Sequence, residues 1–201
     1  MSKLLIATHN KGKLMDFKNL LESFGFELIS LADANIDQEA DENADTFEEN
    51  SYNKAKFYAH LSGVLTLADD GGLEIAALDN KPGVHTRRWE SETPLTDKEL
   101  IDKILDKMKD LKKDERQAVL RTVITVYDPE TSNHVQTEGV INGSIVDALD
   151  LDIIEGYPVR SLFYIPQIAK VYGELSLTEK DSVNHRKMAL EKIKSELIKF
   201  K

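Results

Sequence analysis

Two adjacent aspartates beside an apolar stretch constrain the fold of this chain more than any other feature. Residues 64–67 (VLTL) are apolar and β-branched and predict a short strand, which residues 73–76 could resume. Asp69, Asp70 and two glycines lie between them. Adjacent carboxylates repel, and a divalent cation such as Mg²⁺, which prefers hard oxygen ligands, would offset their charge. The alternative is an Asp-Gly turn in a hairpin, and this stretch alone does not decide between them.

The composition excludes several classes of protein. The chain has 201 residues and a net charge of −10, with 36 acidic and 26 basic residues. A sequence-independent nucleic-acid binder needs a basic surface, so this class is disfavoured. The absence of cysteine excludes disulfides, thiolate zinc sites and cysteine nucleophiles. The apolar runs are too short for a membrane span and the N-terminus lacks a signal-peptide pattern, so we expect a cytoplasmic enzyme or binding protein.

A polar loop near the start of the chain is a candidate phosphate site. Residues 4–7 predict a buried strand, and the apolar stripe from Leu14 to Phe24 predicts a helix that ends at Gly25. Residues 8–13 (THNKGK) lie between them, where the unpaired N–H groups of a helix N-terminus favour anions. The loop lacks the spacing of a Walker A motif. A polar loop with solvated lysines is the alternative interpretation.

An acidic segment, residues 32–45, leads into a second predicted helix. Thr46 opens this helix with a capping box, and the helix continues to about Leu61. Asn50 and Lys54 are four residues apart and therefore share a face of the helix. A lysine on a buried face needs an anionic partner. That partner is either a carboxylate of this chain or a phosphate.

The rest of the chain predicts a mixed sheet and one more cationic patch. Two arginines lie beside the only tryptophan in residues 81–89, and either a phosphate contact or an arginine–tryptophan cation–π contact would explain them. The remaining expected elements are a helix from Thr96 through Met108, a hairpin of strands 117–127 and 134–145, a short strand at 161–165, and a last helix from near Thr178. This pattern predicts an α/β fold with a central mixed, elongated β-sheet flanked by helices. We expect one domain over residues 1–201, with two lobes around a cleft.

In their order along the chain, these motifs resemble those of the inosine triphosphate pyrophosphatase family, the noncanonical purine NTP pyrophosphatases. Residues 8–13 match the T-x-N-x-x-K phosphate loop of that family, and residues 46–55 match its T-F-x-x-N-A-x-x-K-A helix. Residues 68–73 match A-D-D-S-G-L, with Gly71 in place of the serine. Residues 82–88 match its P-G-x-x-S-A-R turn.

The resemblance continues to the end of the chain, with one departure. Lys180 and the pair His185-Arg186 match the family's C-terminal lysine and S-H-R signature. The family carries G-F-G-[YW]-D-P before its F-F-x-P strand, whereas residues 155–161 here are EGYPVRS, with Tyr157 at the aromatic position and Arg160 at the aspartate. An aspartate accepts hydrogen bonds, whereas an arginine only donates them. If Arg160 points inward, we expect 6-keto bases to be preferred over adenine; if it points to solvent, we expect weaker discrimination.

The resemblance implies an activity and its partners. The implied reaction is Mg²⁺-dependent hydrolysis of ITP, dITP and XTP to the monophosphate and pyrophosphate, by attack at the α-phosphorus in a nucleotide-binding cleft. The implied substrate is a small molecule rather than nucleic acid or membrane, and the implied assembly is a homodimer. One alternative is a nucleotide-binding protein with lost turnover or shifted base specificity. Another is a pyrophosphatase for pyrimidine or modified nucleotides.

The resemblance also implies the residues of the site. Asp70, with Asp69 nearby, would be catalytic, and Asp70 would hold the metal together with Asp41 or Glu42. The sequence does not separate these two acids, because Ala44 replaces the family's usual glycine. The implied substrate-binding residues are Thr8, Asn10, Lys11, Lys13, Asn50, Lys54, Gly71, Arg88, Tyr157, Lys180, His185 and Arg186. The last three would contact the base or sugar, and Lys13 and Lys54 the phosphates.

Overall fold

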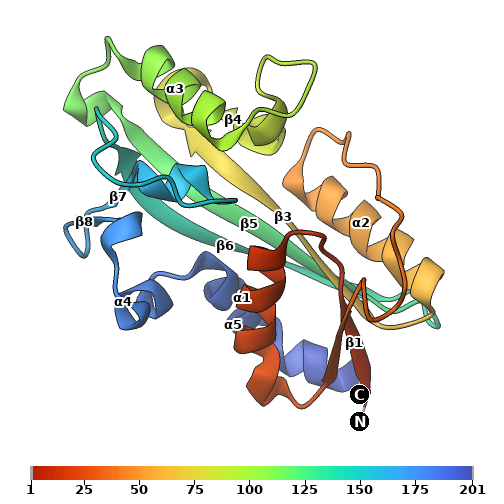
Figure 1. The fold of residues 1–201 in the computed structure, drawn as a ribbon. Helices are drawn as coiled ribbons and strands as arrows, with labels where there is room; N and C mark the ends of the chain where they lie inside the picture. The colour runs from red at the N-terminus through yellow and green to blue at the C-terminus, as the bar shows by residue number, and fades with distance from the viewer. Residues whose placement is uncertain (1, 201) are drawn as a thin grey trace. The chain divides into compact units, whose positions relative to one another are not determined.

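Three long β-strands organise the structure of residues 2–200, which is a computed structural model. They are β3 (Thr66–Ile75), β5 (Gln117–Tyr127) and β6 (His134–Ile145). Parallel and antiparallel strands join them, and helices flank the strands (Figure 1). The expected α/β class with a central mixed sheet is therefore confirmed.

The chain forms two compact units, and each is assembled from separate segments. Unit 1 contains the described residues up to Asp70, Thr122–Gly139, and those from His185 onward. Unit 2 contains Gly71–Arg121 and Val140–Asn184. The three long strands contribute residues to both units, so neither unit is one continuous stretch of sequence.

In unit 1, strand β1 (Lys3–Ile6) pairs in parallel with β2 (Glu27–Ser30) on one side and β3 on the other. The helices of this unit are α1 (Lys11–Leu21), α2 (Phe47–Ser62) and α5 (His185–Leu197). Successive side chains of a strand point to opposite faces of the sheet. Leu4 and Ile6 accordingly pack in one apolar cluster with residues of α1 and α5, whereas Leu5 packs in another with residues of α2 (Figure 1).

Local hydrogen bonds define the ends of these helices, and the cap at Thr46 is where the sequence predicts it. The side chain of Asn10 caps α1 by accepting from the backbone N–H groups of residues 12 and 13. Thr46 caps α2 by accepting from the N–H of Glu49, and its hydroxyl donates to the Glu49 carboxylate. Gly25 and Gly63 follow the helical segments in the left-handed conformation, which glycine adopts without strain.

In unit 2, short strands extend the sheet on the antiparallel side. They are β4 (Lys81–Pro82), which pairs with β3, β7 (Phe163–Ile165), which pairs with β6, and β8 (Lys170–Val171), which pairs with β7. The helices are α3 (Asp97–Met108) and α4 (Leu177–Ser182). The buried guanidinium of Arg116 donates to the carbonyls of Met108, Ile145 and Val146, which joins the end of α3 to the end of β6. Because all three bonds are made, this buried cation is well satisfied.

The structure decides one open alternative and contradicts two expectations about the elements. Strand β3 continues through both aspartates and both glycines, which excludes the hairpin turn left open at residues 69–72. The strand expected at 161–165 begins at Phe163, because the preceding residues form a 3-10 helix. The single last helix is two helices, α4 and α5, since Val183 leaves the helical conformation and packs into the core of unit 2. By contrast, β5 and β6 have the predicted bounds.

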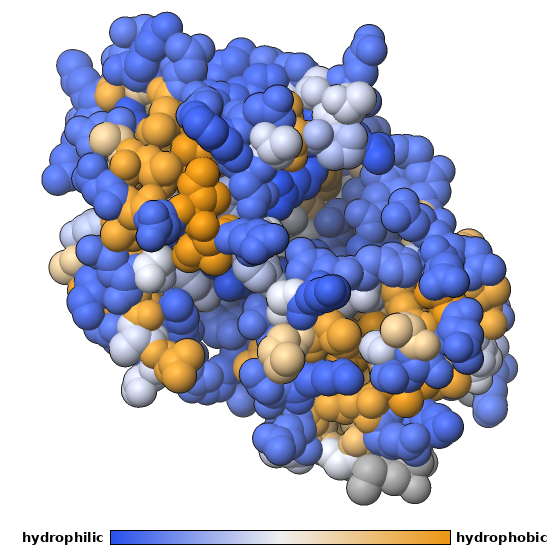
Figure 2. All heavy atoms as spheres, in the orientation of Figure 1, coloured by the Kyte–Doolittle hydropathy of each residue, from blue (hydrophilic) through white to orange (hydrophobic). Residues whose placement is uncertain are grey.

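The face drawn in Figure 2 is largely hydrophilic, with apolar side chains gathered in separate patches. Exposed large apolar residues include Met15, Phe57 and Leu61. Among the described helices, none combines the length and the apolar character that crossing a membrane requires.

We predict that Gly139→Ala destabilises the fold. A Cβ at this position of β6 would lie 1.8 Å from the carbonyl oxygen of His185, so the backbone at the start of α5 would have to move. We expect a loss of about 2 kcal/mol or more in the free energy of unfolding, as for other overpacked sites. Urea denaturation measures it. Gly173→Ala is the control, since its nearest neighbour is the end of the flexible Leu151 side chain, and equal losses in both variants would contradict the prediction.

Candidate active site

The two adjacent aspartates point to opposite faces of β3. Asp69 alternates in step with Leu67, which packs in the cluster of α1 and α5, whereas Asp70 alternates in step with Ala68, which packs in the cluster of α2. The strand therefore separates the two carboxylates that the sequence places together. Each aspartate has its own set of charged neighbours.

Asp69 is a buried carboxylate held by two cations. Lys13 Nζ lies 3.1 Å from its Oδ1, and Arg186 Nε donates to its Oδ2 at 3.1 Å. Thr122 donates to the same Oδ2 at 3.3 Å. Burial alone would raise the pKa of Asp69, but the charges of Lys13 and Arg186 hold it far below its usual range. Asp69 is therefore ionised at any working pH, and Lys13 and Arg186 neutralise its charge.

The cationic partners of Asp69 come from the first turns of two helices. Lys13 belongs to α1, and burial lowers its pKa despite the opposing effect of Asp69. Arg186 belongs to α5, is buried, and also lies 3.5 Å from Asp16. The predicted contact of Arg186 with the base or sugar therefore has to coexist with two carboxylate contacts inside unit 1.

Asp70 has a different environment. It is buried on the α2 side, where the side chain of Asn50 hydrogen-bonds to it. Burial raises the pKa of Asp70, and the nearby negative charge of Glu42 adds to this effect, while Lys13 and Lys54 oppose it. A carboxyl group with a raised pKa is a better proton acceptor than an ordinary aspartate. Of the two aspartates, Asp70 has the electrostatics of a general base.

Of the two candidate metal ligands in the acidic segment, Asp41 and Glu42, it is Glu42 that pairs with a residue of α2. Glu42 forms an ion pair with Lys54, which is buried on the helix. Burial would lower the pKa of Lys54, but the charges of Glu42 and the two aspartates raise it. In this structure the anionic partner of Lys54 is thus a carboxylate of the chain. Both Asp41 and Glu42 are exposed, but the ion pair with Lys54 places Glu42 beside the site.

The predicted phosphate loop is partly occupied by its own hydrogen bonds. The N–H groups of Gly12 and Lys13 donate to the Asn10 side chain, at 2.8 and 3.1 Å, so these two amides are not open to an anion. Thr8 is buried and accepts from the Asn10 N–H, whereas the Lys11 side chain is exposed.

Four predicted substrate contacts belong to unit 2. They are Gly71, Arg88, Tyr157 and Lys180. The Arg160 guanidinium lies over the ring of Tyr157, 3.9 Å from its centroid, and over the ring of Tyr172 at 4.8 Å. Arg160 therefore packs against aromatic rings of its own unit. The arginine–tryptophan contact, one of the two alternatives that the sequence left open, is not among the described contacts of Trp89, whose ring is approached by Lys103 and Lys107.

A clamp on Gly156 holds the loop next to Tyr157. Arg87 forms an ion pair with Asp97 at 2.5 Å. Asp97 also accepts from the Gly156 N–H at 2.8 Å, and Arg87 donates to the Gly156 carbonyl at 3.3 Å. The contacts of Arg87 and Asp97 with Gly156 were not predicted from the sequence. The signal available was the arginine pair at 87–88, of which only Arg88 fits the family motif.

The donors on the α2 side fit a magnesium ion. Glu42 and Asp70 supply two carboxylates that are close enough for one to raise the pKa of the other. Mg²⁺ is usually held by one or two carboxylates together with substrate phosphates, rather than by a complete protein cage. The described residues contain no cluster of three acidic or histidine ligands. This donor set therefore suits a metal that the substrate helps to bind.

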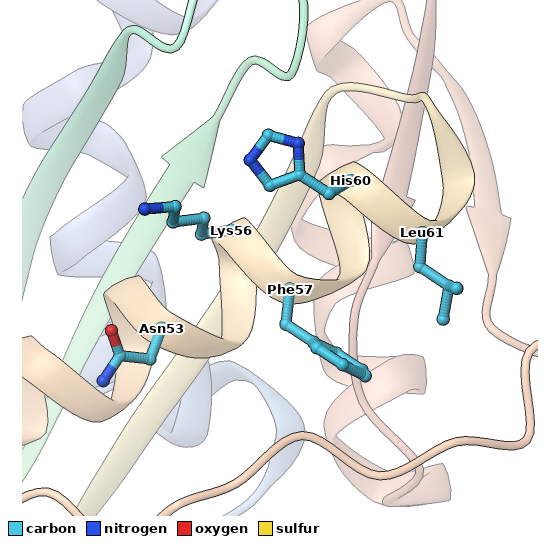
Figure 3. A pocket seen from close by; sticks show the side chains of 5 residues that line it. All are labelled: Asn53, Lys56, Phe57, His60 and Leu61. Atoms are coloured by element: carbon cyan, nitrogen blue, oxygen red, sulfur yellow. The ribbon is translucent and has the colours of Figure 1, made fainter.

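A surface pocket on the outer face of α2 is separate from these residues. It is lined by Asn53, Lys56, Phe57, His60 and Leu61, which project from the helix in several directions (Figure 3). None of these five is a predicted site residue. Asn50 and Lys54 are on the buried face of the same helix.

Comparison with known proteins shows the family. The family model described as the Ham1 family matches residues 4–196. The chain belongs to the Ham1 family. A dITP/XTP pyrophosphatase from Clostridium perfringens is 34% identical over 203 residues, which cover 98% of this chain and 98% of that protein.

Solved structures agree with this membership. A HAM1 protein from Coxiella burnetii has a TM-score of 0.86 and 30% identity, over 99% of this chain and 100% of that one. The Ham1 protein of Staphylococcus aureus has a TM-score of 0.83 and 28% identity, over 100% of each chain. The resemblance inferred from the ordered motifs is thereby confirmed.

For this Ham1 chain we predict that Asp69→Asn is strongly destabilising. The change leaves Lys13 and Arg186 buried without their shared carboxylate, and breaking a buried ion pair costs about 3 kcal/mol or more. Urea denaturation at neutral pH measures the loss. Asp102→Asn is the control, because its pair with Lys98 is exposed and should cost less than about 1 kcal/mol.

The loss of stability in Asp69→Asn should also depend on pH. The pKa of Asp69 is lowered in the folded state, so its stabilisation is complete above the unfolded value of about 4 and is lost as the pH falls toward the folded value. The stability difference between wild type and Asp69→Asn should be constant near neutrality and shrink in acid. A difference no larger than that of Asp102→Asn would refute the pairing.

Proposed function

We propose that the chain hydrolyses dITP, ITP and XTP to the nucleoside monophosphate and pyrophosphate, with water attacking the α-phosphorus. The names of its relatives support this class of substrate. The observation that carries the chemistry is the setting of Asp70, a buried carboxylate with a raised pKa beside Asn50, Lys54 and Glu42. One proton acceptor and one cation thus lie together on the α2 side of β3.

In this proposal each residue on the α2 side has a distinct task. Asp70 orients the attacking water and accepts its proton. Lys54, and Lys13 from α1, offset the negative charge of the triphosphate, which is the main requirement for catalysis at phosphorus. Asn50 holds the Asp70 carboxylate by its hydrogen bond. The remaining proposed substrate contacts are Thr8, Asn10, Lys11, Gly71, Arg88, Tyr157, Lys180 and His185.

Asp69 takes a positioning role rather than that of a base. Its lowered pKa makes it a poor proton acceptor, and its two oxygens already contact Lys13, Arg186 and Thr122. We assign to it the orientation of Lys13 and Arg186. The carboxylates of Asp69 and Asp16 would then hold Arg186 in place. Arg186 would also make the base or sugar contact that the family resemblance implies.

Glu42 and Asp70 would hold Mg²⁺, with substrate phosphates completing the coordination. When bound, the ion would neutralise phosphate charge and make the water more acidic. We prefer Glu42 to Asp41, the other candidate, because Glu42 pairs with Lys54. A cytoplasmic location stays a prediction from the sequence, and a homodimer stays a prediction that rests on the family resemblance.

The proposed function is tested by pyrophosphate release from ITP, dITP, XTP, GTP, ATP and CTP, with Mg²⁺ and with EDTA. We expect release from the first three, its loss in EDTA and its return when Mg²⁺ is added. Binding without turnover would favour the alternative of a nucleotide-binding protein. Turnover confined to CTP would favour a pyrimidine pyrophosphatase.

Asp70→Asn is the matched variant in this assay. Removing a general base typically lowers kcat by about a hundredfold or more. We expect this loss together with an unchanged circular dichroism spectrum, because asparagine has nearly the same shape. Wild-type turnover in the folded variant would remove Asp70 from the mechanism.

The base preference is the finer part of the proposal and concerns Arg160. Its guanidinium face packs on Tyr157 and Tyr172, while its N–H edge can donate only to an acceptor. A 6-keto base presents such an acceptor, whereas adenine presents a donor. We therefore keep the prediction that 6-keto bases are preferred over adenine. In this arrangement Tyr157 stacks on the base, and Arg160, which packs on the Tyr157 ring, holds that ring in position.

The prediction for Arg160→Ala is a lower ratio of kcat/KM for ITP to kcat/KM for ATP. Buried polar groups discriminate strongly because unmatched donors are costly. Arg160→Lys is the control that keeps the charge but loses the planar stacking surface. Equal kcat/KM values for ITP and ATP in the wild type would refute the keto-selective pocket. An unchanged ratio in Arg160→Ala would exclude Arg160 from base selection.

A further inference from the structure

The acidic segment contacts α2 at regular intervals. Ala44 exchanges two backbone hydrogen bonds with the Asn50 side chain, through its N–H at 3.0 Å and its carbonyl at 3.3 Å. Two residues earlier, Glu42 pairs with Lys54. Two residues earlier again, the N–H of Ala40 donates to the Tyr58 hydroxyl at 3.2 Å. Every second residue of the segment thus meets every fourth residue of the helix.

The two spacings match for a simple geometric reason. Four residues of an α-helix rise about 6 Å. Two residues of an extended chain cover about 6.6 Å. A segment that runs beside α2 in the opposite direction can therefore keep step with one stripe of helix side chains over three contacts (Figure 1). The even-numbered residues then face the helix, which is why Glu42 rather than Asp41 meets Lys54.

Tyr58 makes the contacts that end this series. Its ring is buried, with 1% exposure, and its hydroxyl also donates to the Gln38 carbonyl at 2.9 Å. His9 Nε2, from the predicted phosphate loop, lies 3.2 Å from both the Tyr58 hydroxyl and the Gln38 carbonyl oxygen. One hydroxyl therefore connects α2, the acidic segment and the loop after β1.

We propose that Tyr58 is a positioning residue that fixes the register of the acidic segment, so that Glu42 is the acid presented to Lys54 and the proposed metal. This inference rests on the proposed function only for the role of Glu42, since the register itself is a matter of hydrogen bonds. Burial raises the pKa of Tyr58, so its hydroxyl keeps the proton that it donates to Gln38. A slip of one residue would instead turn Asp41 or Asn43 toward Lys54.

The test removes only the hydroxyl. In Tyr58→Phe, the buried ring stays while the hydrogen bonds to Ala40 and Gln38 are lost. We expect faster hydrogen–deuterium exchange at the amides of residues 38–44, by about tenfold, because opening of the segment becomes easier. We also expect Mn²⁺ to bind about five- to tenfold more weakly in calorimetry with a non-hydrolysable triphosphate analogue present, since the carboxylate is no longer held in place.

Tyr52→Phe is the matched control. Tyr52 lies on the same helix, and its ring contacts Tyr127 and His134 rather than the acidic segment. Its exchange rates and Mn²⁺ affinity should equal those of the wild type. The pair Tyr58→Phe and Glu42→Gln adds a second check. If Tyr58 acts through Glu42, its loss should weaken Mn²⁺ binding no further once Glu42 is changed.

The possible outcomes separate the inference from the proposed function. Unchanged exchange at residues 38–44 in Tyr58→Phe would overturn the register role of Tyr58. Faster exchange with unchanged Mn²⁺ affinity would keep the register role and overturn Glu42 as a metal ligand. An equal fall in Mn²⁺ affinity in Tyr58→Phe with and without Glu42→Gln would show that Tyr58 does not act through Glu42.

Discussion

A buried carboxylate in the middle of a strand is the interaction on which unit 1 depends. Asp69 is 1% exposed, and an unpaired charge in that position would be prohibitively costly. The first turns of α1 and α5 must therefore bring Lys13 and Arg186 to the same face of β3. Gly139 permits this, because any side chain there would strike the backbone at the start of α5. The packing of two helices is thus tied to the neutralisation of one charge.

Strand alternation then lets two neighbouring residues serve different purposes. Asp69 faces α1 and α5, has a lowered pKa and holds the structure together. Asp70 faces α2, has a raised pKa and has Asn50, Lys54 and Glu42 around it. In the chemistry we propose, the same sheet supplies both a permanent anion and a proton acceptor. Their spacing of one residue is what places them in separate electrostatic environments.

Much of this could be predicted from sequence, and the failures have physical causes. The helix cap at Thr46 and the hairpin of β5 and β6 depend on local signals, and both were predicted in the right place. The cap at Asn10 was not predicted, because its residues were interpreted as a phosphate loop. The turn that the sequence left open at residues 69–72 does not form, because β3 continues through both glycines. Glu42 could not be told from Asp41, and the clamp of Arg87 and Asp97 on Gly156 could not be seen. Both depend on contacts between distant segments.

The interleaving of the two units has a consequence for synthesis on the ribosome. Asp69 and its partner Arg186 are separated by 117 positions, so the carboxylate emerges long before one of its two cations. When Asp69 emerges, Lys13 is the only one of its two cationic partners that has already left the ribosome. Larger chains tend to expose apolar surface while such distant contacts are missing. Nascent unit 1 should therefore remain loosely packed until α5 has been synthesised. The packing of α5 would then complete the native core of this unit.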